Sequence, residues 1–196
     1  MVVLAQITAD RFRYLVLGDS TLAIDQGKPR IDIITDRRID DVAAAAYQTA
    51  LRTSTPEHQA ARARFVRRQR ELRNQPGGYW IASSDPEAAR YAVTSSVPAA
   101  GVRRAALLSD GVTRFAEFGL GTWDELLAIL GTRGPAKVFF RIRAAEEADP
   151  DGAQWPRAKR HDDMSAVLFT RQDSDTLGEP LTRAAAGKAG GEARCG

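Results

Sequence analysis

The chain contains almost no residues that form covalent cross-links or thiolate metal sites. Its single cysteine, Cys195, lies one residue from the C-terminus, which excludes an intrachain disulfide and a cysteine-based metal site. Only two histidines, His58 and His161, can supply imidazole chemistry near neutral pH. Apolar runs such as residues 14–17 are far shorter than the roughly 20 residues of a membrane-spanning helix. We therefore expect a cytoplasmic protein without a membrane partner.

Lysine is scarce as well, so arginine carries nearly all of the positive charge. The formal net charge is +3 and the isoelectric point is near 9.3. Residues 57–73 contain six arginines and two glutamates, a local net charge of +4, which leaves the remainder of the chain at −1. The basic isoelectric point thus describes one segment and not a protein that is basic throughout.

The rest of the composition is that of an ordinary folded domain. Of the 196 residues, 43% are hydrophobic and 27% are charged, which is typical of a chain that buries a core. This length is more consistent with one domain than with two. Four β-rich runs separated by polar or glycine-containing breaks predict an antiparallel meander over residues 2–7, 12–17, 21–25 and 30–35.

Helical patterns follow the predicted meander. Acidic residues at 40–41 favour the start of a helix over residues 42–51, and Thr55-Pro56 open a second helix that extends to about Asn74. Further strands are expected at residues 79–82, 91–97, 104–108 and 165–170, and further helices at residues 123–130 and 135–147. This order predicts an α+β layered fold in which a pair of sheets is covered by helices.

Carboxylates stand at the ends of three predicted strands. Asp19 follows the second strand, Asp110 follows the strand over residues 104–108, and Asp162-Asp163 precede the last strand. Mg²⁺ and Mn²⁺ prefer oxygen ligands, and such ions activate water and clamp phosphoryl oxygens. The pattern indicates metal-assisted hydrolysis of a phosphate ester, although each segment is also an ordinary turn or loop sequence when taken alone.

Three motifs resemble those of one enzyme family. They are residues 14–20, followed by a strand and Thr35-Asp36, residues 107–112, and residues 161–168. Their Gly-Asp-Ser, Ile-Thr-Asp, Ser-Asp-Gly and Asp-Asp-Met-Ser sequences are similar to motifs of the bacterial metal-dependent type 2C, or PPM-type, Ser/Thr protein phosphatases. The motifs occur in the order of that family, and Asp162 lies 52 residues beyond Asp110.

The resemblance implies a fold, a reaction and ligands. The fold is a four-layer α-β-β-α sandwich, and the reaction is hydrolysis of phosphoserine or phosphothreonine in a phosphoprotein substrate. By motif, Asp110 and Asp162 would hold one Mn²⁺ or Mg²⁺, and Asp19 with Asp110 would line a further metal site. Asp163 stands where the family usually has asparagine, and we include it among the candidate ligands.

One family motif has no counterpart in this chain. The family's Asp-Gly-x-Gly-Gly sequence, whose aspartate bridges two metals, occurs nowhere, and neither does its early phosphate-binding arginine. The resemblance therefore implies a partial phosphatase domain over residues 1–170, incomplete at the N-terminus, with a helical insert at about 40–76 and a disordered tail over 171–196. We expect weak or absent activity, and either a misassigned start or a truncated remnant accounts for the pattern.

Two further groups of residues are candidates for function. His161 adjoins Asp162 and is a possible general acid for the leaving alkoxide. The arginine-rich segment is a solvated face or a partner-binding surface, and its candidate residues are Arg62, Arg64, Arg67, Arg68 and Arg70. A catalytically inactive phosphatase-like binding module is thus the alternative function. Nucleic acid is not the expected partner, because the segment contains one aromatic residue and no DNA-reading motif.

Overall fold

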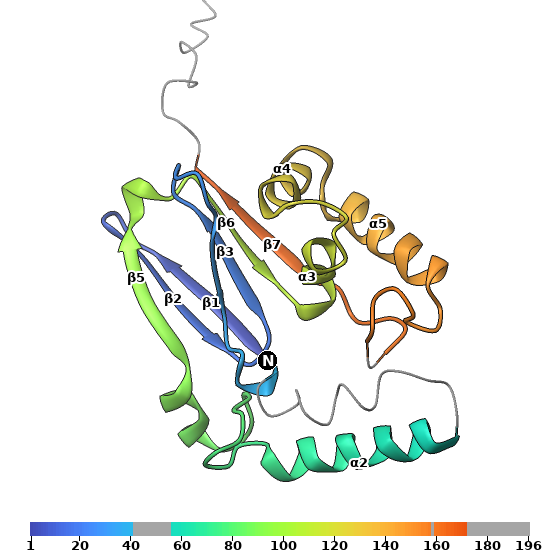
Figure 1. Ribbon diagram of the computed structural model, residues 1–196. Coiled ribbons are helices and arrows are strands. Elements are labelled where there is room, and N and C mark those ends of the chain that lie inside the picture. The colour runs from blue at the N-terminus through green and yellow to red at the C-terminus, as the bar shows by residue number, and fades with distance from the viewer. Residues whose placement is uncertain (41–55, 158, 172–196) are drawn as a thin grey trace, which may run out of the picture.

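The structure is a computed structural model that describes residues 1–40, 56–157 and 159–171 (Figure 1). The strands are β1 (Val2–Ile7), β2 (Arg11–Leu17), β3 (Thr21–Asp25), β4 (Asp32–Thr35), β5 (Val93–Pro98), β6 (Arg104–Leu108) and β7 (Ala166–Thr170). The helices are α2 (Pro56–Leu72), α3 (Asp110–Glu117), α4 (Trp123–Arg133) and α5 (Pro135–Ala148), with short 3₁₀ helices η1 (Pro86–Tyr91) and η2 (Ala99–Gly101). The predicted helix over 42–51 and the predicted tail beyond Arg171 lie outside the described residues.

The strands form two antiparallel sheets. One has the order β1-β2-β5 and the other has the order β4-β3-β6-β7. The expected four-stranded meander is therefore wrong, since its first two strands lie in one sheet and the next two in the other. The crossing occurs at Gly18, whose φ of +79° is a left-handed conformation that favours glycine. Both strand pairs have an apolar face, and stacking the sheets buries the two faces against each other.

The core between the sheets comes from alternate residues of the strands. Phe12 and Val16 of β2 face Leu22 and Ile24 of β3, and all four side chains are fully or almost fully buried. Strand β3 is buried along its whole length because its other face is covered by helices. Asp25 is the one charged residue of this strand, and it forms ion pairs with Arg103 and Arg104.

A second core lies between the four-stranded sheet and helices α3, α4 and α5. Ala23 and Ala106 are directly opposite each other in β3 and β6, and both are completely buried. Their small side chains leave room for the larger helical residues that pack on them, Val112, Phe115, Leu126, Leu127, Leu130, Val138 and Ile142. This packing fixes α3 against the end of β6.

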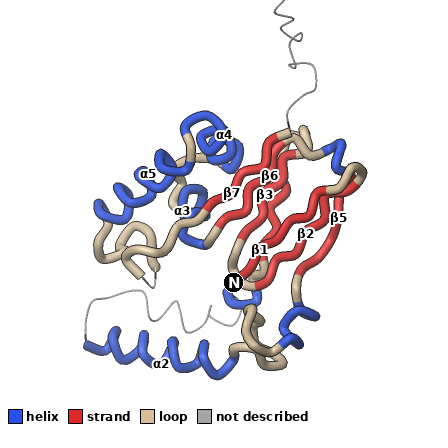
Figure 2. Tube along the Cα trace, turned by 180° about the vertical axis from the view of Figure 1, so that it is seen from behind, coloured by secondary structure: helices blue, strands red, loops and turns tan. Residues whose placement is uncertain are grey.

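The described helical layer covers only one of the two sheets (Figure 2). On the outer face of β1-β2-β5, the segment before β5 covers Leu17 with the buried side chains of Trp80 and Ala88. Trp80 also stacks on Tyr91, with ring centroids 3.7 Å apart. Leu4 of β1 remains 57% exposed. The α+β class is confirmed, and the described part of the chain has three layers instead of the expected four.

Three predictions of local structure need correction. The segment 79–82 is not a strand, because Tyr79 makes only an isolated bridge to Arg73 after the turn that ends α2. Strand β5 begins at Val93 and not at residue 91, since Asp85 and Pro86 start η1, with the Asp85 side chain as its cap. Helix α3 was not predicted, because Ser109-Asp110-Gly111 read as a turn and the helix has only eight residues.

Within the described residues, no helix is long and apolar enough to cross a membrane.

Candidate functional site

The register of the larger sheet brings the three acidic segments to one edge. Thr21 at the start of β3 pairs with Leu108 at the end of β6, and Leu108 pairs with Ala166 at the start of β7. Asp19, Asp110 and Asp162 lie just outside this row of residues. The edge is the end of the molecule where the N-terminus lies (Figure 1). The structure therefore brings together the three carboxylates that the sequence placed at strand ends.

The turn that carries Asp19 is held in place by Asp36 of the Ile-Thr-Asp sequence. The Gly18 N–H donates to Asp36 Oδ2 at 3.4 Å, and the Thr35 hydroxyl donates to the Ser20 carbonyl at 3.2 Å. Asp36 is 4% exposed and pairs with Arg38 through Nε at 2.8 Å and Nη2 at 2.6 Å. Burial acts to raise the pKa of Asp36, but the hydrogen bonds from Arg38 and Gly18 outweigh it and lower the pKa. Asp36 is thus ionised at neutral pH, and its carboxylate holds the Gly18 turn through hydrogen bonds.

Asp19 lacks such compensation. Its Oδ1 is buried, and no hydrogen-bond donor reaches it from the described residues. Burial and the negative charge of Asp110 raise its pKa to about 6, while the N-terminal amino group acts in the opposite direction. A carboxylate oxygen that is buried without a donor costs free energy unless a proton or a cation occupies it.

Asp110 is the first residue of α3, where the helix dipole favours a negative charge. Burial nevertheless raises its pKa, and the charge of Asp162 raises it further. The Gly111 N–H, Lys159 and Arg114 only partly offset these effects. The charge of Asp110 thus acts on Asp19, and the charge of Asp162 acts on Asp110, so the neighbouring carboxylates disfavour each other's ionised forms.

A close backbone contact holds the 162–165 segment against the start of α3. The Ser109 hydroxyl donates to the Asp163 carbonyl at 3.1 Å and accepts from the Ser165 N–H at 3.0 Å. The Ser109 N–H donates to the Ser165 carbonyl at 3.0 Å. A Cβ at position 111 would lie 2.3 Å from the Asp163 carbonyl oxygen, so this approach requires glycine. The Ser-Asp-Gly sequence thus holds the 162–165 segment against the start of α3, in addition to forming a turn.

Asp162 contacts two cationic side chains. Its Oδ1 is 3.0 Å from Lys159 Nζ and its Oδ2 is 3.3 Å from Arg114 Nη2. Lys159 is 62% exposed, so its pair with Asp162 is weak and a metal ion can replace it. The neighbouring Asp163 is exposed and enters the site through its backbone, which makes it a poorer candidate ligand than Asp162.

Helix α3 adds residues that the sequence reasoning missed. Thr113 Oγ1 lies 2.7 Å from both the Asp110 carbonyl oxygen and Glu117 Oε1. Burial raises the pKa of Glu117, and the charges of Asp40 and Asp110 add to that effect. The spacing 110, 113, 114 and 117 places Asp110, Thr113, Arg114 and Glu117 on one helical face. That pattern would have identified them had α3 been predicted.

His161 lies beside the site and is anchored by a buried carboxylate. Its Nδ1 is 2.9 Å from Glu146 Oε2, and its side chain is 42% exposed. The ring is therefore held at one nitrogen while part of it reaches solvent. This arrangement is compatible with proton transfer to a substrate, and the sequence had indicated His161 only by its position beside Asp162.

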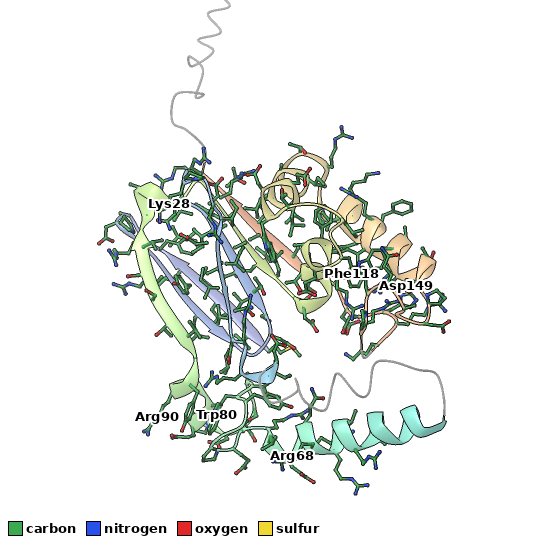
Figure 3. All side chains as sticks on the ribbon, viewed as in Figure 1. Lys28, Arg68, Trp80, Arg90, Phe118 and Asp149 are labelled. Atoms are coloured by element: carbon green, nitrogen blue, oxygen red, sulfur yellow. The ribbon has the colours of Figure 1, made fainter. Side chains whose placement is uncertain are left out.

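The candidate arginines lie on α2, apart from the acidic edge. The side chains of Arg64, Arg67, Arg68 and Arg70 are exposed, and that of Arg62 lies outside the described residues. Arg68 makes one exposed pair, with Glu71 at 3.3 Å. Helix α2, on which Figure 3 labels Arg68, lies beyond the end of the sheets where the N-terminus lies. Among the side chains that the structure describes, these arginines make no contact with the three carboxylates.

Carboxylate oxygens are the ligands that a hard divalent cation prefers. Over residues 1–40, 56–157 and 159–171, no three acidic, histidine or cysteine side chains form a ready-made ligand cluster. Mg²⁺ is commonly held by one or two carboxylates while it keeps several waters. The donorless Oδ1 of Asp19 and the mutual repulsion of Asp19 and Asp110 suit that mode of binding.

Comparison of the chain with protein-family models, with curated proteins and with solved structures finds no match. A functional assignment therefore depends on the residues of the site. The relevant properties are the placement of three carboxylates at one end of the sheet and their burial. The contacts of Asp162 with Arg114 and Lys159, and of His161 with Glu146, complete the set.

Proposed function

We propose that this protein is a metal-dependent phosphatase of the PPM type that hydrolyses phosphoserine or phosphothreonine in proteins. The observation that carries the proposal is the buried, donorless Oδ1 of Asp19 next to Asp110, at the sheet edge shared with Asp162. The proposal includes the four-layer sandwich of that family. The two stacked sheets and the helices on one of them support it.

Asp110 and Asp162 would hold one Mn²⁺ or Mg²⁺, and Asp19 with Asp110 would hold another. When bound, such an ion lowers the pKa of a coordinated water and neutralises phosphoryl oxygens. Asp163 would contribute its backbone and, at most, an outer negative charge. Because each ion would be held by few protein ligands, we expect weak metal binding and slow turnover.

The chain's own side chains would orient the substrate and move a proton. Lys159 is exposed next to Asp162, so its ammonium group can contact a phosphate oxygen. Arg114 is largely buried and holds Asp162 Oδ2, which limits the orientations of that carboxylate. His161, fixed at Nδ1 by Glu146, would donate a proton to the leaving alkoxide of the phosphoserine or phosphothreonine.

The proposal is tested by hydrolysis of a small aryl phosphate with Mn²⁺. Asp110→Asn and Asp162→Asn should each reduce the Mn²⁺-dependent rate at least about 100-fold, since each removes a negative ligand. Asp151→Asn is the matched control, because it removes an exposed carboxylate that is not a candidate ligand. Its rate should stay within about twofold of the unmodified chain. Activity that persists in EDTA or in both ligand variants would refute the metal-dependent mechanism.

A second candidate function is that of a binding module that uses α2. The observation in its favour is that Arg64, Arg67 and Arg68 share one helical face by spacing and are all exposed. Such a face fits an acidic peptide segment by charge complementarity. This function requires no metal, so it would remain if hydrolysis were absent.

The binding function is tested with a fluorescent glutamate-rich peptide in EDTA. Neutralisation of Arg64, Arg67 and Arg68 to Gln should weaken its binding at least about 10-fold, and Arg133→Gln on α4 serves as a control for the loss of an exposed arginine elsewhere. A single-stranded oligonucleotide of the same charge is the competing ligand. If the oligonucleotide binds more tightly and with the steeper salt dependence, nucleic acid is the partner and the peptide function is wrong.

A further inference from the structure

The carboxylate of Glu146 on α5 is buried, and its only part in the reaction described above is to hold His161. The residue is 1% exposed, and burial of a charged group is costly unless the group is paired and hydrogen-bonded. Its Oε1 accepts from Arg114 Nη1, and its Oε2 accepts from Arg143 Nη1 at 2.6 Å. His161 Nδ1 is 2.9 Å from the same Oε2. One carboxylate thus binds three basic side chains.

All three basic side chains either contact Asp162 or belong to the residue next to it. The second amino group of Arg114 contacts Asp162 Oδ2 at 3.3 Å. The second amino group of Arg143 donates to the backbone carbonyl of Asp162 at 2.5 Å. His161 is itself the residue before Asp162. The carboxylate on α5 therefore reaches the side chain of Asp162, its backbone and its neighbour through three separate contacts.

The charges in this network are strongly coupled. Burial acts to raise the pKa of Glu146, but the hydrogen bonds from His161, Arg114 and Arg143 outweigh it, and the pKa is lowered. Glu146 is thus ionised at neutral pH. Loss of its charge would leave Arg114 nearly buried beside Arg143 without its main counter-charge.

We infer that Glu146 is a positioning residue that fixes the orientation of Asp162 and His161 toward the cation and the leaving group. The inference depends on the proposed role of Asp162 as a metal ligand. Groups that hydrogen-bond a metal ligand orient it, and their loss typically reduces metal affinity by about 10-fold to 100-fold. Glu146 acts in this way through Arg114 and Arg143, and it acts directly on His161.

Asp25 distinguishes positioning from simple stabilisation. It is also a carboxylate with 1% exposure, and it also binds two arginines, Arg103 at 2.9 Å and Arg104 at 2.7 Å. It lies at the end of β3 away from Asp19, where Asp25 pairs with Arg104. Asp25→Asn should therefore destabilise the fold as Glu146→Gln does, but it should leave the metal site in place.

The experiment compares Glu146→Gln with Asp25→Asn and with Glu147→Gln, the exposed neighbour on the same helix. Mn²⁺ binding to the metal-free full chain is measured by the electron paramagnetic resonance of free Mn²⁺. Amide hydrogen exchange of the peptide covering residues 159–165 is measured in EDTA. Glu146→Gln should weaken Mn²⁺ binding about 10-fold to 100-fold and increase exchange of that peptide several-fold, and both control variants should leave both quantities unchanged. Glu146→Asp, which keeps the charge, should restore part of the affinity.

The outcomes separate this inference from the proposed function. If the unmodified chain binds no Mn²⁺, both the proposed function and the positioning role are wrong. If it binds Mn²⁺ but Glu146→Gln changes neither affinity nor exchange, the positioning role alone is wrong. Equal loss of affinity in Asp25→Asn would show that general destabilisation explains the effect, and it would likewise overturn the inference.

Discussion

Substitution of Gly111 by alanine is the most direct test of how the site is assembled. The new Cβ would lie 2.3 Å from the Asp163 carbonyl oxygen, 3.1 Å from the Asp163 carbonyl carbon and 3.2 Å from Met164 Cγ. Real Cβ contacts are essentially never shorter than 3.0 Å, so the 163 carbonyl must shift by about 0.7 Å or more. No side-chain rotation relieves the clash, because its closest atom, the Asp163 carbonyl oxygen, belongs to the backbone.

The shift has a calculable effect on stability and on the site. Overpacking of this kind typically costs about 1–3 kcal/mol. Lengthening the bond from the Ser109 hydroxyl to the Asp163 carbonyl, now 3.1 Å, adds about 1 kcal/mol at most. Because Asp162 precedes the displaced carbonyl, a movement approaching 1 Å should reduce Mn²⁺-dependent hydrolysis by up to about 100-fold.

Urea unfolding and aryl phosphate hydrolysis measure the two effects separately. Gly131→Ala is the matched control, because Gly131 lies inside α4 and a Cβ there would meet only Cδ2 of Leu168, at 3.4 Å. Alanine at that helical position should be neutral or stabilise the protein by about 0.5–1 kcal/mol. If Gly111→Ala is as stable and as active as Gly131→Ala, the contact between α3 and the 162–165 segment does not organise the site.

Three other predictions concern the charges and the helix ends. Burial and the charge of Asp110 raise the pKa of folded Asp19 to about 6, so the folded state binds a proton that the unfolded state has lost. In EDTA, the unmodified chain should therefore lose about 1–2 kcal/mol of stability as the pH rises from about 4 to about 6. Asp19→Asn should remove this pH dependence in urea unfolding. Asp149 accepts from three backbone N–H groups and pairs with Arg157 at 2.8 Å, and despite burial these bonds lower its pKa to about 2. Its contribution is therefore complete above about pH 4 and is lost as the pH falls through about 2, so Asp149→Asn should cost about 3 kcal/mol at pH 7 and much less near pH 2 by the same method. Thr122→Ala removes the capping box with Glu125 and should cost about 1 kcal/mol, a decrease of about 2–4 °C in Tm by calorimetry, whereas an unchanged Tm would show that the cap does not contribute.

Local sequence patterns predicted most of the described strands and helices. Strand β6 was predicted at its full extent, 104–108, and α5 to within a residue, because a proline starts that helix and its apolar residues have a helical period. The same reasoning failed at residues 79–82, which read as a strand although Tyr79 and Trp80 are buried in a connecting segment. Apolar character alone does not distinguish a strand from a buried loop.

The candidate carboxylates were predictable, and their supporting residues were not. Asp19, Asp110 and Asp162 each adjoin a strand, a relation that is local and visible in the sequence. Glu146 lies 32 residues from Arg114 in the sequence and contacts it only because α3 and α5 pack together. The motif that contains Asp36 is visible in the sequence. Its hydrogen bond with the Gly18 N–H, however, depends on how the chain crosses from one sheet to the other.

The sequence by itself determined the α+β class, the strand ends that carry carboxylates and the concentration of the net positive charge in residues 57–73. These features depend on side-chain chemistry and on periodicity over a few residues. Tertiary structure decided that the first four strands divide between two sheets. It also decided that no donor from the described residues reaches Oδ1 of Asp19, while Asp36 has several donors. Burial and electrostatic coupling arise only when segments distant in sequence are packed together, and these effects distinguish one aspartate from another in this protein.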